Sequence, residues 1–228
     1  MRNKTTMVDK VKLGKSLMEL LGTAILVLTI QVSVTLGSAA APCAIGAVLI
    51  TIVFAGGPIS GAHYNPAITL AIRLRGKVLT HELAVYWVSQ VLGGILGAVL
   101  GGVIAGNFSN IGVGEGFSLS QAILAEIVFT FILCFVVLGV ATSSKSDGND
   151  YYGLAIGLVV LSGAYTVGPI SGGAFNPGVA LGLCIAKGFD NFSYVISVVI
   201  ANLIGGALAS GCFYLTAPDQ FEGYTSVV

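Results

Sequence analysis

Two short stretches of the sequence carry its most distinctive polar residues, and each contains an Asn-Pro pair near its end. Residues 57–68 and 168–179 align at a fixed offset of 111, and seven of the twelve aligned positions are identical. Asparagine is a good helix N-cap, and proline fits the first helical turn, where its missing N–H is not needed. Each stretch therefore predicts a loop that enters a short helix, the first capped by Asn65 and the second by Asn176.

The chemistry that these two asparagines offer is hydrogen bonding. The side-chain oxygen of each can cap its own helix, which leaves the NH₂ group as a donor aimed into the space between the helices. Two helix N-termini that point at one place add partial positive charges of about 0.5 e each. Such a place holds the oxygen of a water or a hydroxyl, disfavours cations and interrupts proton hopping. Aspartate would cap the helix equally well but would attract cations.

The helices behind the asparagines are too short to span a membrane. The apolar residues after Asn65 end at Leu74, so a half-helix over 66–74 is roughly 15 Å long, half of a hydrocarbon core of about 30 Å. Its counterpart covers 177–186. Paired short segments in corresponding halves of a membrane protein indicate discontinuous helices that meet at the bilayer midplane. Loops at that depth must be buried in protein or line a wet cavity.

The composition agrees with a membrane protein. The chain has 228 residues, of which 55% are hydrophobic and 9% charged, and its mean hydropathy is +0.95. These values predict a polytopic, all-α membrane protein in contact with a lipid bilayer. The net charge is zero, which gives no indication of nucleic acid binding. The four cysteines show no metal-ligand spacing, and we expect neither a metal nor a cofactor.

Six apolar spans accompany the two half-helices, at about 16–36, 43–60, 83–105, 119–141, 152–170 and 192–216. Each half of the chain then has three spans, an odd number, so the halves must insert with opposite topology as an inverted repeat. The predicted organisation is an N-terminal segment at 1–15, a first repeat at 16–105, an extracellular loop at 106–118, a second repeat at 119–216 and a C-terminal tail at 217–228. Nine of the ten basic residues fall on one side of this arrangement, so the positive-inside rule places both termini in the cytoplasm.

The two boxes, the repeat and the number of spans together resemble the aquaporin, or major intrinsic protein, family. The boxes are Asn65-Pro66-Ala67 and Asn176-Pro177-Gly178. The resemblance covers roughly residues 16–216, and Glu19, Glu126 and the run Tyr86-Trp87-x-x-Gln90-x-x-Gly93 also match the family pattern. It implies an hourglass-shaped homotetramer, not an enzyme, in which each subunit has one pore for water or small neutral solutes. We expect a multi-pass protein, with the plasma membrane favoured over an intracellular one.

The resemblance also implies roles for single residues. Glu19 and Glu126 are expected to be buried struts that bind the backbone of the half-helix loops, in preference to direct contact with solute. His63 is expected to support the pore loop and face the cytoplasmic vestibule, with a pH gate as the alternative. The outer selectivity filter corresponds by spacing to Ile45, Ala164, Gly173 and Val179.

The sequence departs from the family at this filter, because Val179 stands where the family usually has arginine. A filter arginine narrows the pore, binds water oxygen and repels cations. Glycerol-conducting members usually place aspartate next, where this chain has Ala180. The expected ring is therefore wide and apolar, and it suits a range of small uncharged molecules. Two alternatives stay open: a poorly conducting structural or junctional protein of the same fold, and a coupled transporter.

Overall fold

The computed structural model describes residues 4–221, with side-chain surroundings from Met7 onward. Helices account for all the regular structure in this range. In chain order they are α1 (Lys4–Thr35), α2 (Ala41–Ser60), α3 (Pro66–Leu74), α4 (Thr80–Ala105), α5 (Leu119–Ala141), the 3₁₀ turn η1 (Ser144–Ser146), α6 (Tyr152–Thr166), α7 (Gly168–Ser171), α8 (Pro177–Ala186), α9 (Phe192–Thr216) and the 3₁₀ turn η2 (Pro218–Phe221).

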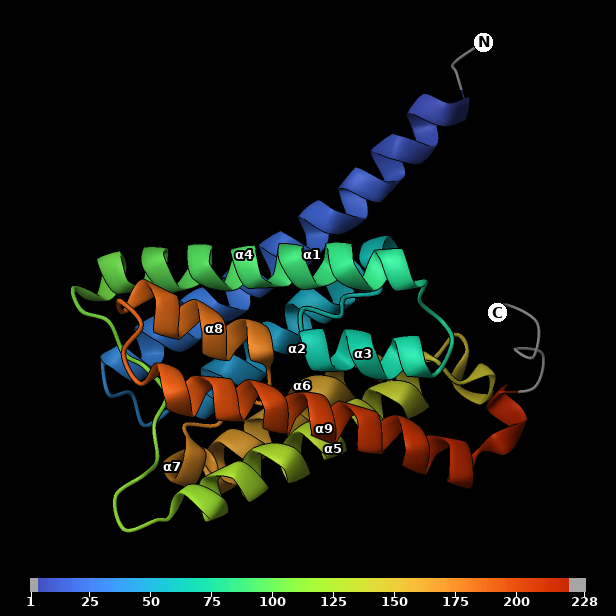
Figure 1. Cartoon of the computed structure of the whole chain (residues 1–228). Coiled ribbons are helices and arrows are strands. Elements are labelled where there is room, and N and C mark those ends of the chain that lie inside the picture. Colours follow the sequence, from blue (N-terminus) through green and yellow to red (C-terminus); the bar gives the residue numbers. More distant parts are fainter. Residues whose placement is uncertain (1–3, 222–228) are drawn as a thin grey trace.

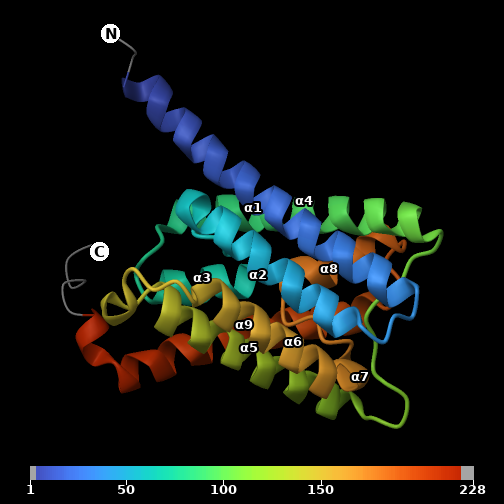
Figure 2. The same cartoon turned by 180° about the vertical axis from the view of Figure 1, so that it is seen from behind.

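The helices form one bundle in which the two halves of the chain repeat each other. Helix α1 packs along α4, and α5 packs along α9, while α2 meets α6 between the halves. The short helices α3 and α8 start near the middle of the bundle and run towards opposite ends (Figures 1 and 2). They cover 66–74 and 177–186, the same residues as the two half-helices expected from the sequence. This arrangement brings both Asn-Pro pairs to the centre of the molecule.

Each half-helix is held by a long helix of the other half, and glycines permit the close approach. Helix α4 packs against α8, and α9 packs against α3. A Cβ added to Gly94 of α4 would lie 2.3 Å from the carbonyl oxygen of Gly178. One added to Gly206 of α9 would lie 2.7 Å from that of Ala67. Since real Cβ atoms do not approach this closely, these two glycines fix the depth of both half-helices in the bundle.

The sixth predicted span differs from expectation. Five helices are long and apolar enough to cross a membrane by length and composition, namely α1, α2, α4, α5 and α9. The span predicted at 152–170 is divided, because α6 ends at Thr166 and α7 begins at Gly168. The division lies beside Pro169, which lacks the N–H for a helical hydrogen bond and whose ring crowds the preceding turn.

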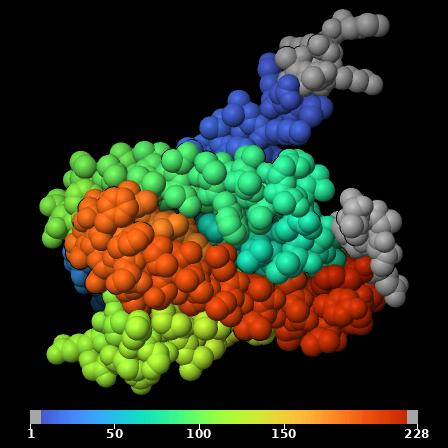
Figure 3. Space-filling view, viewed as in Figure 1, coloured from blue at the N-terminus to red at the C-terminus, as the bar shows by residue number. Residues whose placement is uncertain are grey.

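The N-terminal segment predicted at 1–15 is not a separate element where it is described. Helix α1 already begins at Lys4, since helix formers such as lysine, methionine and leucine run through to Lys15 without a stop signal. The start of α1 projects beyond the bundle (Figures 1 and 3). Residues 1–3, with Arg2 of the basic N-terminal segment, and residues 222–228 of the C-terminal tail lie outside the described range.

The 3₁₀ turn η2 lies at the end of the bundle from which α1 projects (Figures 1 and 2). The Lys145 ammonium lies 2.7 Å from an Asp219 carboxylate oxygen, and Gln220 accepts a hydrogen bond from the Ser144 backbone N–H. Arg75, at the end of α3, is buried, with its guanidinium 4.5 Å from the centre of the Phe221 ring. The first half-helix, the α5–α6 loop and the C-terminal turn are therefore linked on one side.

Candidate functional site

The two Asn-Pro pairs form matching helix starts at the centre of the bundle. Asn65 caps α3, and its Oδ1 accepts a hydrogen bond of 2.9 Å from the Ala67 N–H. Asn176 caps α8, and its Oδ1 accepts one of 2.8 Å from the Gly178 N–H. Pro66 and Pro177 occupy the first helical positions, where a missing N–H costs nothing. Both helix N-termini thus face the same region, as the sequence predicts.

The amide nitrogens are arranged differently from expectation, because each crosses to the loop of the other half. Asn65 Nδ2 donates to the carbonyl oxygen of Phe175 at 2.8 Å, and Asn176 Nδ2 donates to that of Tyr64 at 2.9 Å. The prediction of two NH₂ groups aimed only into the cavity is therefore wrong in part. One hydrogen of each amide ties the two halves together, and the other remains available to a solute.

The carbonyls that receive these amides belong to strained residues. Tyr64 has φ of 50° and Phe175 has φ of 48°, a left-handed conformation that residues other than glycine seldom adopt. Such strain persists only where surrounding contacts over-determine the backbone. In both loops the contact is a glutamate that accepts the N–H of the strained residue.

Glu19 of α1 supports the first loop and is fully buried. Its Oε1 accepts from Ser60 Oγ at 2.7 Å and from the His63 N–H at 3.0 Å. Its Oε2 accepts from the Tyr64 N–H at 2.7 Å and from Gln90 Nε2 at 2.8 Å. Four donors surround this carboxylate, so both oxygens are engaged by the protein and neither is left for a solute.

Glu126 of α5 supports the second loop in the same way. Its Oε1 accepts from Ser171 Oγ at 2.7 Å and from the Ala174 N–H at 2.9 Å. Its Oε2 accepts from the Phe175 N–H and from Asn202 Nδ2, both at 2.8 Å. The buried positions and four protein donors of both glutamates agree with a strut and give neither one a free oxygen for transport.

Two cavities meet at the pore loops. The outer one, of about 300 Å³, reaches from Ser109 and Asn110 of the long connecting loop down to Asn65 and Asn176. The inner one, of about 380 Å³, is lined on the opposite side by polar and charged residues that include Lys15, Lys77, Glu82 and Asp147. The two cavities share His63 and Ile68 as lining residues.

The structure brings the four expected filter residues together. Ile45, Ala164, Gly173 and Val179 come from four separate segments, and all line the outer cavity. None of these four residues carries a side-chain charge, so they contribute only uncharged lining to the cavity.

His63 lies at the base of this cavity and also lines the inner one. Its Nδ1 is 3.1 Å from Thr69 Oγ1, and its ring packs edge-on against that of Tyr86 with centroids 5.1 Å apart. These contacts fit a supporting histidine, and the ring borders both cavities where the sequence had suggested only the cytoplasmic vestibule.

Some contributing residues gave little signal in the sequence. Ile111 of the 106–118 loop is buried and lines the outer cavity, packed where Gly172 has no side chain. Nothing in the sequence around Ile111 points to this position. Ser60 and Ser171, which donate to the two glutamates, were visible only as identical positions of the repeat.

Comparisons with known proteins agree with this geometry. The sequence profile described as "Major intrinsic protein" matches residues 7–210 and 147–227. "Probable aquaporin NIP-type" of Nicotiana alata is 32% identical over 167 residues, covering 70% of this chain and 60% of the relative. "Aquaporin NIP1-3" of Oryza sativa subsp. japonica is 35% identical over 172 residues, covering 74% and 58%. The chain thus spans about three fifths of the length of these curated relatives.

The fold is also that of a solved structure. "X-ray structure of the aquaglyceroporin from Plasmodium falciparum" superposes with a TM-score of 0.81 and covers 92% of this chain and 98% of that one, at 22% identity. At that identity the likeness establishes the fold alone. The family follows from the profile, which matches most of the sequence, and from relatives above 30% identity: the chain belongs to the major intrinsic protein family.

Proposed function

We propose that this chain forms a passive transmembrane channel for water and small uncharged solutes, with a wide apolar outer ring. The observation that carries the proposal is that one cavity is lined both by Ile45, Ala164, Gly173 and Val179 and by the asparagine pair. The names of the relatives, which are aquaporins, support the same activity. No chemistry beyond hydrogen bonding is needed for it, and the protein acts as a channel and not as an enzyme.

Exclusion of ions rests on the centre of the molecule. With Val179 in place of an arginine, the ring contains no side-chain charge. Cation repulsion then comes from the N-termini of α3 and α8, which contribute about 0.5 e each, and from the free amide hydrogens of Asn65 and Asn176. Since uncharged solutes are not repelled by these groups, the proposed pore is selective against charge.

A coupled transporter is a weaker candidate for the same fold. It needs an ionisable group that meets the solute within the membrane. Glu19 and Glu126 are buried, and all four of their oxygens accept hydrogen bonds from the protein. A poorly conducting structural protein differs from a channel only in its flux, which the experiment below measures.

The expected setting is a multi-pass protein of the plasma membrane that assembles as a homotetramer, with both termini in the cytoplasm. Basic residues support this orientation, since Lys15 and Lys77 line the same inner cavity and Lys145 pairs with Asp219 of η2. Single cysteines at Asn107 and Lys187 should react with an impermeant reagent from outside, and one at Lys145 only from the cytoplasm. The reverse pattern would refute the orientation.

The substitution Val179→Arg tests the open ring. Arginine adds a long, permanently charged side chain with five donors, which narrows the ring and repels cations. Stopped-flow light scattering on proteoliposomes should show glycerol permeability falling more than water permeability. If Val179→Arg lowers both permeabilities by the same factor, or changes neither, the wide ring is wrong.

A further inference from the structure

The two cavities meet next to the asparagine pair, where they share lining residues. Asn65 and Asn176 line only the outer cavity, whereas two residues, His63 and Ile68, line both. His63 belongs to the first pore loop, and Ile68 lies in the first turn of α3. We call the place where these two side chains border both cavities the neck.

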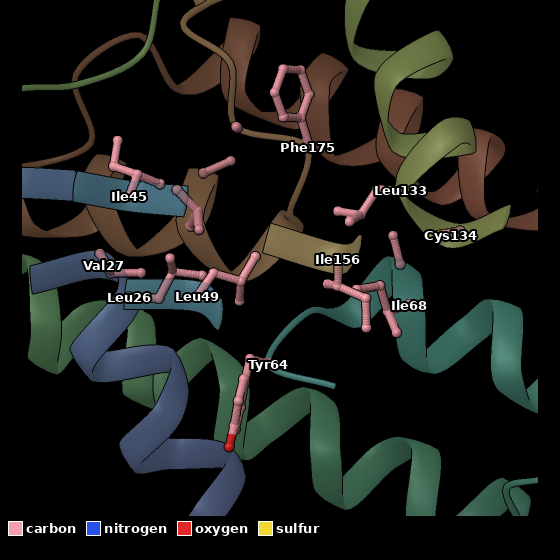
Figure 4. Packing of buried hydrophobic residues seen from close by; sticks show 14 of the residues in the cluster. Leu26, Val27, Ile45, Leu49, Tyr64, Ile68, Leu133, Cys134, Ile156 and Phe175 are labelled. Carbon is pink, nitrogen blue, oxygen red and sulfur yellow. The ribbon is translucent and has the colours of Figure 1, made fainter. Parts of the chain in front are cut away.

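The walls around the neck change from one cavity to the other within a single helical turn. Three helices each contribute a pair of residues four positions apart, of which one lines the outer cavity and the other lines the inner cavity. These pairs are Leu49 and Val53 on α2, Leu133 and Val137 on α5, and Val160 and Ile156 on α6. Ile68, Leu133 and Ile156 point into one region from three different helices in Figure 4.

The hydrogen bonds of His63 determine what the neck offers to a solute. Thr69 Oγ1 donates its single hydrogen to the Asn65 carbonyl at 3.0 Å, and it accepts from Gln90 Nε2 at 2.9 Å. A hydroxyl has one donor and two acceptor positions, so the remaining contact, from His63 Nδ1 at 3.1 Å, requires a proton on Nδ1. The tautomer assigned in this way leaves Nε2 of the neutral ring as an acceptor.

Nε2 is the part of His63 that a solute meets. Among the residues that the structure describes, Nε2 has no hydrogen-bond partner, and it is not among the fully buried unpaired atoms. The neck thus combines one hydrogen-bond acceptor with the branched apolar side chain of Ile68. Water, urea and glycerol all have hydrogens to donate to such a group, and they differ in the width that must pass Ile68.

We propose that the neck formed by His63 and Ile68, and not the outer ring, determines which uncharged solutes pass and at what relative rates. The inference rests on the proposed channel function. Its basis is the lining of the two cavities: the four ring residues border only the outer cavity, whereas His63 and Ile68 border both. In this chain, the loss of the ring arginine moves the size limit inward, to the base of the outer cavity.

The test compares two isoleucines on the same half-helix. Ile68→Ala and Ile72→Ala delete the same atoms from side chains of similar burial, at 5% and 6% exposure, but Ile72 lines only the inner cavity. Val179→Ala is the third variant and widens the outer ring. The ratio of glycerol to water permeability is measured for each by stopped-flow light scattering on proteoliposomes of equal protein content.

Ile68→Ala removes three carbon atoms and should raise the glycerol-to-water permeability ratio at least about tenfold, the lower end of what a single methylene changes in an apolar pocket. The other two variants should change it several times less. Equal ratios in all three variants, or a larger change in Val179→Ala, would overturn the neck while leaving the channel intact. If Ile68→Ala does not fold, Ile68→Val removes one methyl group and should change the ratio in the same direction.

The outcomes also distinguish a failure of the neck proposal from a failure of the proposed channel function. No flux of water or solute above empty vesicles, in wild type and in every folded variant, would contradict the channel itself. Flux in Ile68→Ala with a closed wild type would support the neck as the limiting point. His63→Ala removes the hydrogen-bond acceptor. It should therefore change the permeability ratio of two solutes of similar width, such as urea and acetamide, more than Ile68→Ala does, and bring that ratio closer to one.

Discussion

Replacing Glu19 by glutamine removes the charge from the strut beneath the first pore loop and keeps its size. The carboxylate now accepts four hydrogen bonds, and two of them, from the Tyr64 N–H and Gln90 Nε2, converge on Oε2. The glutamine amide has one oxygen and one NH₂ group in place of two oxygens. If the NH₂ group takes the place of Oε2, it faces two hydrogen-bond donors and can accept from neither. Gln90 can turn its amide to present Oε1, which has no partner among the described residues, but it then gives up the bond from its Nε2 to Thr69 Oγ1 and so recovers only part of the loss. The Tyr64 N–H, fixed in a strained backbone, cannot adapt.

The magnitude follows from the bonds that are lost. A hydrogen bond to a charged group contributes roughly 1.5–3 kcal/mol, and a buried donor left unpaired costs roughly 1–3 kcal/mol. Since Gln90 recovers part of the loss and the Tyr64 N–H does not, Glu19→Gln should destabilise the protein by about 2–4 kcal/mol. The carbonyl of Tyr64 also accepts a hydrogen bond from the Asn176 amide at the centre of the molecule. A shift of Tyr64 would therefore displace Asn176, so Glu19→Gln should lower the water permeability as well as the stability.

The assay is unfolding of purified protein in mixed detergent micelles, with water permeability measured on the same preparation. Glu115→Gln is the matched control, since Glu115 is exposed on the 106–118 loop, and Glu126→Gln should reproduce the loss in the second half. If Glu19→Gln unfolds at the same denaturant concentration as Glu115→Gln and conducts normally, the carboxylate does not support the loop.

Three further changes have defined outcomes. Gly22→Ala places a Cβ 2.1 Å from the Tyr64 ring and should cost about 1–3 kcal/mol in the same unfolding assay, whereas Gly14→Ala on the same helix meets nothing within 4 Å and should not destabilise. Asn176→Asp keeps the cap but sets a carboxylate against the Tyr64 carbonyl, so a proton or cation leak or a loss of folding is expected; a tightly ion-excluding, stable channel would contradict the site. The Lys145 ammonium holds the pKa of Asp219 below its usual range. The difference in thermal stability between wild type and Asp219→Asn should therefore be small and constant from pH 8 to about pH 5, and should vanish as the pH falls through that lowered pKa. A difference that grows in acid would contradict the ion pair.

Much of the fold could be predicted from the sequence because local chemistry determines it. Apolar runs of membrane length gave the long helices, and the Asn-Pro pairs gave both half-helix starts. The role of the two glutamates came from the resemblance to the family, and it agrees with the rarity of ionisable residues within membrane spans. Each of these features depends on neighbouring residues along the chain.

What the sequence did not reveal depends on contacts between distant segments. The crossing of Asn65 to Phe175 and of Asn176 to Tyr64 joins residues more than one hundred positions apart. The break before α7 reflects how one proline was accommodated, since Pro58 at the equivalent position lies inside the unbroken helix α2. Ile111 enters the outer cavity only because its loop folds back over Gly172.

The central claim is that the chain is a passive pore for water and small uncharged solutes. Stopped-flow light scattering on proteoliposomes of the wild-type protein, with water and then urea, measures this directly. Both should cross faster than in empty vesicles, at rates that do not change when a proton or sodium gradient is imposed. Flux that requires such a gradient, passage of water with urea excluded, or no flux above that of the lipid would contradict the claim.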